Sequence, residues 1–322
     1  MRKKILLAAV FLMSTLIYGP ATAQGYPSKN ITVIVPFPAG GINDTAVRIL
    51  QPEIEKRLGT SLIIENRIGA GGVVGTQAVV RSAPDGHTLL AVASSHAVIP
   101  AANTKISYDA VKDLSPVVMI ARDPMLFLVN GKTPAATLPE LVSLAKAKPG
   151  TLNYSSPGFG SQTQFIVELF KSQAGIQIQH VPFRGGAPAL QALIQGDVDF
   201  SVLSGQVSLP HVAAGSIRAI ALGGKARDPR TPGIPTVVEA GFPDVVAIQW
   251  VGLLAPAKTP EGNLLRLNTV VNEALSDPNV REKLAIQGMT PLGGSREVLG
   301  AAIEEEVLLW KNIATSTGMK MD

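Results

Sequence analysis

Residues 31–58 read ITVIVPFPAGGINDTAVRILQPEIEKRL. The first five, Ile31–Val35, form a short apolar run rich in β-branched side chains, which predicts a buried strand. A loop of proline and glycine follows, and the residues after it repeat with a helical period. The apolar face of that helix is predicted to hold Val47, Leu50, Ile54 and Leu58. Pro52 lies within the pattern and predicts a kink or a division of the helix.

The same strand–loop–helix alternation continues along the rest of the chain. Further strands are predicted over residues 62–65, 88–93, 126–129, 177–181, 198–203, 217–222 and 246–254. Further helices are predicted over about 75–82, 139–148, 162–174, 187–195, 260–276, 278–287 and 295–316. Such alternation indicates an α/β fold in which helices flank parallel strands. The sequence itself shows no internal repeat.

The length of 322 residues predicts two domains, at roughly 150 residues for each. The segments near 121–127 and 245–251 are predicted to cross between them, and the helical C-terminal tail is expected to pack on the first. The predicted boundaries are an export signal over 1–23, lobe 1 over 24–124 plus 248–322, and lobe 2 over 125–247. Two lobes joined by a double crossover hinge would leave a cleft between them.

The first residues predict export from the cytoplasm. Arg2, Lys3 and Lys4 precede an apolar run from Ile5 to about Tyr18, and Ala21-Thr-Ala23 follows. A cationic start, an apolar stretch shorter than a membrane span and an A-x-A site are typical of a secretory signal peptide. Cleavage is predicted after Ala23, and the absence of cysteine suits a periplasmic protein.

Charge and cysteine content exclude several classes of protein. The chain has 28 Lys and Arg residues against 24 Asp and Glu, and three of the cations lie in the predicted signal, which leaves 25 against 24. A nearly neutral mature chain does not indicate nucleic-acid binding. Zero cysteines exclude disulfides, thiolate nucleophiles, cysteine metal sites and a lipid anchor on cysteine.

The catalytic and cofactor motifs in the sequence are incomplete. GAGGVVG, residues 69–75, lacks the third glycine of a dinucleotide-binding loop, because Val74 takes that place, and no acidic residue follows at the required spacing. No GxSxG sequence is present, and the four histidines include no HxxxH pair. The sequence therefore predicts no cofactor and no metal site.

Two glycine-rich loops with little charge predict a site for an anion. They are PFPAGGIND, residues 36–44, and YSSPGFGS, residues 154–161, and each lies just before a predicted helix. The start of a helix presents unpaired N–H groups and a positive dipole end, to which a carboxylate binds without a dedicated cation. The alternative is that each loop is only a capped helix start, with Asp44 and Ser161 as the caps.

A third loop, VPFRGGAP over residues 181–188, again joins a predicted strand to a helix. Its Arg184 is the only cation in the three loops, and it could hold a carboxylate with two hydrogen bonds or remain a solvated surface residue. Asp199 lies in an apolar strand, where it could accept a hydrogen bond from a ligand or orient a loop, and we favour the second role.

At these residues the chain closely resembles the Bug family, the solute-binding proteins of tripartite tricarboxylate transporters. The resemblance rests on PFPAGGINDTAVR, ENRIGAGGVVGTQAVVRSAPDGHTLL, PGTLNYSSPGFGS, HVPFRGGAPALQALIQGDVDF and LLAPAKTP, in the family's order and spacing. It implies a periplasmic binding protein of the type II, Venus-flytrap kind, with a mixed sheet flanked by helices in each lobe. It also implies a carboxylate ligand held between the lobes by loop backbone and ordered water.

The resemblance also implies a set of ligand-binding residues. In lobe 1 they are Phe37, Ala39, Gly40, Gly41, Asp44 and Ser95. In lobe 2 they are Ser155, Ser156, Gly160, Ser161, Arg184, Gly185, Ala187 and Ser204. The chain departs from the family's frequent His at Gln164, Tyr-Lys at Phe183-Arg184 and Asp-Asn at Leu203-Ser204. These departures favour a mono- or dicarboxylate with an apolar or aromatic body over a citrate-like ligand.

The resulting hypothesis is a non-catalytic periplasmic receptor, monomeric, that delivers a small carboxylate to the integral subunits of a membrane transporter. One alternative is an exported hydrolase that uses the same cleft, with Ser156 or Ser161 as the nucleophile and His96 or His180 as the base. Another is a protein that presents the bound ligand to a sensor kinase.

Overall fold

The computed structural model describes residues 25–103, 105–245 and 247–317. The predicted signal peptide, residues 1–23, and its cleavage after Ala23 lie outside the described residues. The strands are β1 Ile31–Val35, β2 Leu62–Asn66, β3 Thr88–Ala93, β4 Leu114–Asn130, β5 Asn153–Ser156, β6 Gln179–Pro182, β7 Phe200–Ser204, β8 Ile217–Leu222, β9 Ile248–Pro256 and β10 Thr290–Pro291.

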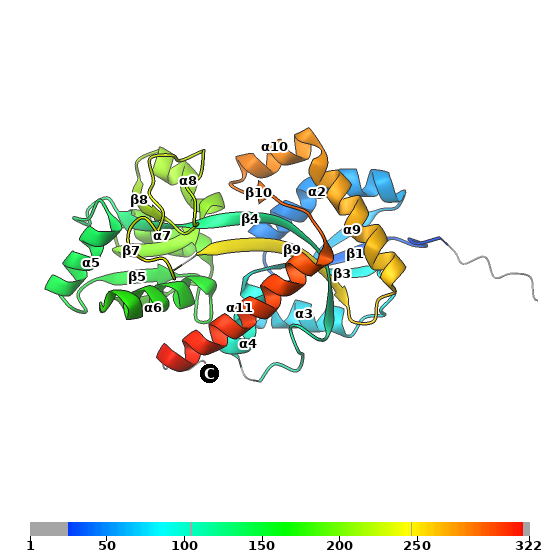
Figure 1. The fold of residues 1–322 in the computed structure, drawn as a ribbon, viewed down its shortest axis with the longest axis horizontal. Helices are drawn as coiled ribbons and strands as arrows, with labels where there is room; N and C mark the ends of the chain where they lie inside the picture. Colours follow the sequence, from blue (N-terminus) through cyan, green and yellow to red (C-terminus); the bar gives the residue numbers. More distant parts are fainter. Residues whose placement is uncertain (1–24, 104, 246, 318–322) are drawn as a thin grey trace, which may run out of the picture.

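The helices lie on both sides of these strands (Figure 1). They are α2 Ile42–Leu58, the 3₁₀ turn η1 Ala70–Gly72, α3 Val73–Val80, α4 Ser95–Ala102, α5 Leu138–Ala147, α6 Gln162–Ala174, α7 Gly186–Gln195, α8 Gly205–Ala213, α9 Glu261–Ser276, α10 Pro278–Ile286 and α11 Arg296–Thr317. The predicted α/β class is confirmed.

Two long antiparallel strands, β4 and β9, run side by side between the two ends of the molecule (Figure 1). The strands follow the order β2-β1-β3-β9-β4-β7-β5-β6, with β8 and β10 also paired to β4. Up to Pro124 strand β4 pairs with β9, and from Met125 it pairs with β7 and β8. The chain crosses back at Ala247, whose N–H donates to Gly223 O at 2.8 Å. The molecule is therefore a two-lobe binding-protein fold with a double crossover.

Strand β4 is longer than the sequence predicted. The prediction covered residues 126–129, whereas the strand has 17 residues and contains both Pro116 and Pro124. Proline normally argues against a central strand because it cannot donate to the ladder. Here the pairing of β4 with β9 shifts register between Pro116 and Val118 and between Met119 and Ala121, so the strand accommodates the irregularity.

The two lobes repeat one topology that the sequence did not reveal. In lobe 1, which we define by β1–β3, the strands are parallel in the order β2-β1-β3. In lobe 2, defined by β5–β8, the parallel strands follow the matching order β6-β5-β7. Helices α2, α3 and α4 thus correspond to α6, α7 and α8. The predicted residue boundaries of the lobes, 24–124 with 248–322 and 125–247, remain a prediction.

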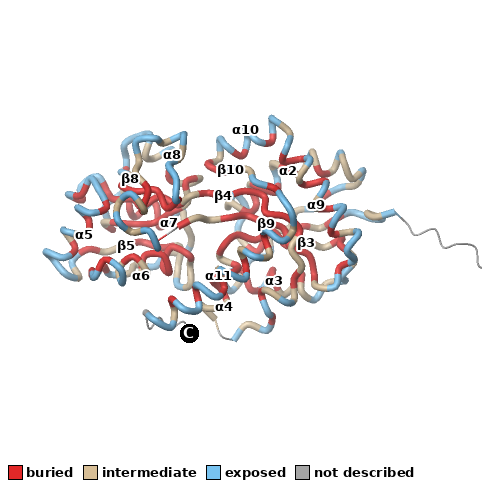
Figure 2. Tube along the Cα trace, viewed as in Figure 1, coloured by how far each residue is buried: buried red, intermediate tan, exposed pale blue. Residues whose placement is uncertain are grey.

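Each lobe has a buried core around its sheet (Figure 2). In lobe 2 the rings of Phe127, Phe170 and Phe200 meet with centroids 5.8 to 6.1 Å apart, and all three side chains are fully buried. In lobe 1 the predicted strand β1 buries Ile31 and Val33, and the predicted face of α2 buries Leu50. Burial of such side chains is the main favourable term in folding.

Three helices differ from the prediction because of proline. Helix α2 continues through Pro52 without division, and Pro52 is exposed, so that water can reach the carbonyl that the missing N–H leaves without a partner. Helices α4 and α8 were not predicted at all. Each is short, at 8 and 9 residues, and contains a proline, Pro100 or Pro210, that obscures the helical pattern.

Helix α11 contacts both lobes. Its predicted apolar stripe is buried, with Leu299 fully enclosed and Trp310 3% exposed. The Trp310 ring meets Phe165 of α6 edge-on at 5.8 Å, so the C-terminal tail packs on lobe 2 as well as on the expected first domain. In the described part of the chain, no helix is both long and apolar enough to span a membrane.

Glu306 of α11 lies beside the crossover strand β9. Its Oε1 accepts a hydrogen bond of 2.8 Å from the indole N–H of Trp250. Burial raises the pKa of the Glu306 carboxyl to about 7, and the Trp250 hydrogen bond only partly opposes that shift.

Replacement Glu306→Gln should weaken the pH dependence of stability. Because the folded-state pKa of Glu306 lies above the unfolded value, its favourable contribution is complete below about pH 4.5 and is lost as the pH rises through about 7. Denaturant unfolding at pH 5 and pH 8 should show a smaller loss of unfolding free energy in the variant than in the wild type. Glu304→Gln, at an exposed glutamate of the same helix, is the control. Equal pH dependence in all three proteins would contradict the assignment.

Candidate functional site

The predicted site residues lie where parallel strands end and helices begin. Because β1, β2 and β3 are parallel, the starts of α2, α3 and α4 share one edge of the lobe 1 sheet. Because β5 is parallel to β6 and to β7, the starts of α6, α7 and α8 share the corresponding edge in lobe 2. Ligands of open α/β sheets bind outside the carboxyl ends of the strands.

One side-chain contact joins these two edges. The amide nitrogen Nε2 of Gln206, in the first turn of α8, donates to Thr45 Oγ1 in the first turn of α2, at 3.3 Å. Close by, a Cβ added to Gly288 would lie 3.0 Å from the Gln206 backbone nitrogen. The helix starts of the two lobes are therefore neighbours, as a site between the lobes requires.

Asp44 organises the lobe 1 loop. Its Oδ2 accepts from the Gly40 N–H and from Arg48 Nε, both at 2.9 Å, and its Oδ1 accepts from Asn66 Nδ2 at 3.1 Å. The N-cap of α2 is Gly41, so Asp44 is not the cap that the alternative interpretation expected. Burial raises the pKa of the Asp44 carboxyl, but these hydrogen bonds outweigh burial and lower it overall.

The loop tip in front of α2 is open. Pro38, Ala39 and Gly40 are exposed, while the Phe37 ring packs over Gly72, where an added Cβ would come within 3.1 Å of the ring. Asn66 Nδ2 also donates to Phe37 O at 3.0 Å and fixes the loop from β2. No side chain caps α2, α3 or α4. The N–H groups at the start of these lobe 1 helices are therefore not taken up by caps.

The lobe 2 loop repeats the arrangement with a neutral residue. Gly160 N–H donates to Gln164 Oε1 at 2.7 Å, four residues on, as Gly40 donates to Asp44. Ser161 is the N-cap of α6 and accepts from Gln164 N–H at 3.4 Å, so for Ser161 the capping interpretation is confirmed. The Gly40–Asp44 and Gly160–Gln164 bonds were not predicted, although the shared spacing of four residues after a glycine is visible in the sequence.

The hydroxyls of Ser155 and Ser156 are both engaged within lobe 2. Ser155 is fully buried and donates to Ala189 O at 2.9 Å. Ser156 Oγ lies 2.6 Å from His180 Nε2 and accepts from the Gly158 N–H at 3.1 Å. The first residues of the predicted loop, up to Ser156, in fact form strand β5.

The hydrolase alternative named two serines and two histidines. Among them, the structure brings Ser156 and His180 into hydrogen-bond contact. The hydroxyl is fully buried, and the His180 ring stacks on Tyr154 at 4.8 Å. Burial lowers the pKa of His180. His96 is buried elsewhere, with Nε2 2.9 Å from Ala110 O and its pKa lowered to about 4 by burial. An enclosed hydroxyl is poorly placed to attack a substrate.

Arg184, Gly185 and Ala187 lie at the start of α7, beside the β5–α6 loop. Gly185 N–H donates to Pro157 O at 3.0 Å, and Gly185 has a φ of +117°, which favours glycine. Arg184 is exposed and has no ion pair among the described residues. Asp199 Oδ2 accepts at 2.9 Å from the N–H of Asn153, the first residue of β5, which favours a structural role over a ligand contact.

Ser95 and Ser204 lie at corresponding helix starts, α4 and α8. Ser95 is the first residue of α4, after Ser94, whose Oγ accepts from the Trp250 N–H at 2.9 Å. Ser204 is the N-cap of α8, and its hydroxyl donates to the carboxylate of Asp123. Sequence analysis missed Asp123, although an acidic residue in the apolar run before Pro124 is an available signal.

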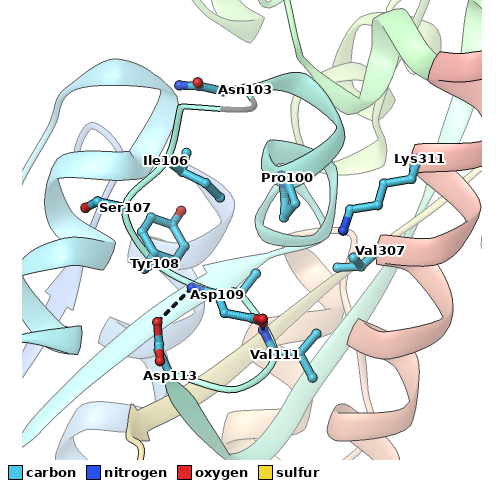
Figure 3. A pocket seen from close by; sticks show the side chains of 11 residues that line it. Pro100, Asn103, Ile106, Ser107, Tyr108, Asp109, Val111, Asp113, Val307 and Lys311 are labelled. Carbon is cyan, nitrogen blue, oxygen red and sulfur yellow. Dashed lines mark hydrogen bonds between the residues drawn. The ribbon is translucent and has the colours of Figure 1, made fainter.

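Two surface depressions lie on the molecule, one away from these helix starts and one beside the start of α7. The first, of about 430 Å³, is lined by Pro100, Asn103, residues 106–111 and Asp113, and by Val307 and Lys311 of α11; its lining contains none of the predicted residues (Figure 3). The second, of about 500 Å³, lies along α7 and includes Ala187 and Phe183. No group of metal-binding side chains occurs in the described residues.

Comparison with known proteins gives consistent matches over nearly the whole chain. A family model described as "Tripartite tricarboxylate transporter family receptor" matches residues 46–319. BugT of Bordetella pertussis is 34% identical over 323 residues, which cover 100% of this chain and 99% of BugT.

Solved structures of similar proteins superpose well. MatC of Rhodopseudomonas palustris, with bound malate, is 34% identical with a TM-score of 0.81, covering 89% of this chain and 99% of MatC. Rpa4515 of R. palustris, with adipate, is 32% identical with a TM-score of 0.83, covering 91% of this chain and 98% of Rpa4515.

Replacement Asp44→Asn should destabilise the lobe 1 loop. In the variant, the amide NH₂ group faces donors that in the wild type bind a carboxylate oxygen. Hydrogen bonds to charged groups contribute about 1.5–3 kcal/mol each. We expect denaturant unfolding to show a loss of about 2 kcal/mol. Glu65→Gln, which breaks the exposed pair with Arg67, is the control and should change stability by less than about 1 kcal/mol. Equal losses in the two variants would contradict the organising role of Asp44.

Proposed function

The chain belongs to the tripartite tricarboxylate transporter receptor family, and from this premise we propose that it captures a small organic carboxylate between its lobes for delivery to a membrane transporter. Receptors of this family are periplasmic solute-binding proteins. The observation that carries the proposed ligand class is the start of α2, where an exposed glycine loop leads into a helix that no side chain caps.

A carboxylate suits the start of α2 on physical grounds. The first N–H groups of a helix have no partner within it and lie at the positive end of its dipole. Gly40 and Gly41 allow a ligand to approach the backbone, and Asp44 does not repel an anion there as a free carboxylate would, because Arg48 pairs with it. The malate of MatC and the adipate of Rpa4515, both carboxylates, support this ligand class.

The proposed contacts come from both lobes. Lobe 1 contributes Phe37, Ala39, Gly40, Gly41, Asp44 and Ser95. Lobe 2 contributes Ser155, Ser156, Gly160, Ser161, Arg184, Gly185, Ala187 and Ser204. Because the hydroxyls of Ser155 and Ser156 are engaged internally, we expect these two residues to act through their backbone. Arg184, exposed and without an ion pair in the described residues, is the cationic side chain of the set.

We propose that binding occurs without catalysis. The buried Ser156 hydroxyl supports this, since its contacts with His180 and Gly158 hold the β5–α6 loop. The proposal includes export through the signal peptide with cleavage after Ala23, a monomeric protein, and a membrane transporter as the partner. Binding of the ligand with closure of the lobes would then distinguish the loaded receptor for the transporter.

The proposal is tested by thermal unfolding of the mature chain in the presence of a carboxylate panel. The panel contains dicarboxylates, citrate, nicotinate, benzoate, terephthalate and acidic amino acids, each paired with its amide. A ligand at 100 times its dissociation constant stabilises the folded protein by about 2.7 kcal/mol, which raises the melting temperature. We expect at least one acid to stabilise the protein and its amide to have no effect.

Two results would contradict the proposal. Equal stabilisation by acid and amide would remove the carboxylate as the recognised group. In a second measurement, mass spectrometry follows a bound ligand during prolonged incubation with the protein. Chemical alteration of that ligand would show that the protein is an enzyme. Retained ligand is first removed by unfolding and refolding, so that an absence of any shift is informative.

Phe159 should contribute to the binding of ligands with an apolar body. It lies between Gly158 and Gly160 in the β5–α6 loop and is 75% exposed, which leaves a large ring available for contact. Full burial of such a side chain is worth about 1.5–3 kcal/mol. Phe159→Ala should therefore weaken benzoate-like ligands by about tenfold or more and acetate hardly at all. Leu308→Ala, at an exposed leucine of α11, is the control and should change neither affinity.

A further inference from the structure

The carboxyl of Asp123 binds the start of helix α8 from strand β4, at the crossover between the lobes. It lies in β4, just before the strand passes from one sheet to the other, and it is 1% exposed. Its Oδ1 accepts from the Gly205 N–H at 3.1 Å, and its Oδ2 accepts from the Ser204 hydroxyl. Ser204 Oγ in turn accepts from the Gln206 N–H at 3.2 Å. Two N–H donors at the start of α8, those of Gly205 and Gln206, are thus satisfied by the protein itself.

The contact depends on a glycine at the first position of α8. A Cβ added to Gly205 would lie 2.8 Å from Asp123 Oδ1, a distance that real side chains do not adopt. The close approach of the Asp123 carboxyl to α8 therefore depends on Gly205 as well as on Asp123. Burial raises the pKa of the Asp123 carboxyl to about 7, against the hydrogen bonds from Ser204 and the α8 backbone. The Gly205 N–H can donate to Oδ1 in either protonation state, whereas a proton on Oδ2 would reverse the hydrogen bond with the Ser204 hydroxyl.

The corresponding helix of lobe 1 has no such residue. Helix α4 begins after Ser94, whose hydroxyl is bound to the backbone of Trp250, and no side chain caps the helix. In lobe 2 the two helices that follow the strands nearer the hinge, α6 and α8, are both capped by side chains. Of the six helices at these edges, the four without a side-chain cap are therefore α2, α3 and α4 of lobe 1 and α7 of lobe 2.

The start of α8 is close to the proposed carboxylate site. Gln206 is the second residue of α8, and its side chain reaches Thr45 in the first turn of α2 at 3.3 Å. A ligand held at the start of α2 therefore lies within one side-chain length of the start of α8. If the α8 donors were free, a second carboxylate on the ligand could accept hydrogen bonds from them.

We propose that Asp123 is a specificity-determining residue, which fills the start of α8 and so restricts the site to ligands with one carboxylate. The inference rests on the proposed carboxylate function and narrows it to monocarboxylates. Asp123 acts through α8 and touches no ligand, since its carboxyl is enclosed by β4, Ser204 and Gly205. A second carboxylate that reaches the start of α8 would have to displace Asp123 or lack the Gly205 and Gln206 donors, which costs affinity.

The test is calorimetric titration of the mature chain with acids matched in length: butyrate against succinate, and hexanoate against adipate. The wild type should bind the monocarboxylate of each pair more tightly. Asp123→Ala vacates the start of α8 and should shift the ratio of the two dissociation constants toward the dicarboxylate by about tenfold. Asp123→Asn keeps the α8 donors occupied by a group of the same shape, and its ratio should stay within about twofold of the wild type.

The ratio separates specificity from a structural role. A variant that is only less stable loses affinity for both acids alike, and an unchanged ratio in Asp123→Ala would overturn the proposal. Tighter binding of the dicarboxylates by the wild type would overturn it too, without any need for a folded variant. Failure of all four acids and of the wider panel would instead contradict the carboxylate function on which the proposal rests.

Discussion

The pairing of β4 with β9 is the constraint on which the rest of the structure depends. Because β4 pairs with β9 before Pro124 and with β7 after it, one continuous strand belongs to both sheets. Each set of three parallel strands attaches to these two strands in the same order. The edges where α2 and α8 begin are thereby brought into contact. The location of the candidate site thus follows from strand pairing, and the loops supply only its chemistry.

The sequence predicted those parts of the fold that are locally determined. Strand β1 and helix α6 matched because the apolar run of the strand and the helical pattern with its flanking glycines are each complete within a few residues. The first half of β4 and helices α4 and α8 were missed because proline interrupts each pattern and only tertiary pairing compensates. A propensity-based prediction weighs proline without the partners that offset its cost.

The candidate site shows the same division between local and distant information. Glycine loops ahead of helices were visible in the sequence, and the structure has them at the carboxyl ends of β1 and β5. The bonds of Asp44 to Asn66 and of Ser155 to Ala189 were not visible, since their partners lie 22 and 34 residues away. Such partners decide whether a polar side chain faces a ligand or supports a loop. A prediction from residue type alone therefore overestimates the number of hydroxyl groups that a ligand can contact.

Helix α11 places an aromatic residue where the lobes meet. The chain contains two tryptophans, Trp250 in β9 and Trp310 in α11. The first donates to Glu306, and the second packs on Phe165 of lobe 2. Both indoles are almost fully buried between elements that would shift relative to each other if the lobes moved. The protein thus carries its own optical probe, and its ultraviolet emission would report the conformation of the hinge without any attached dye.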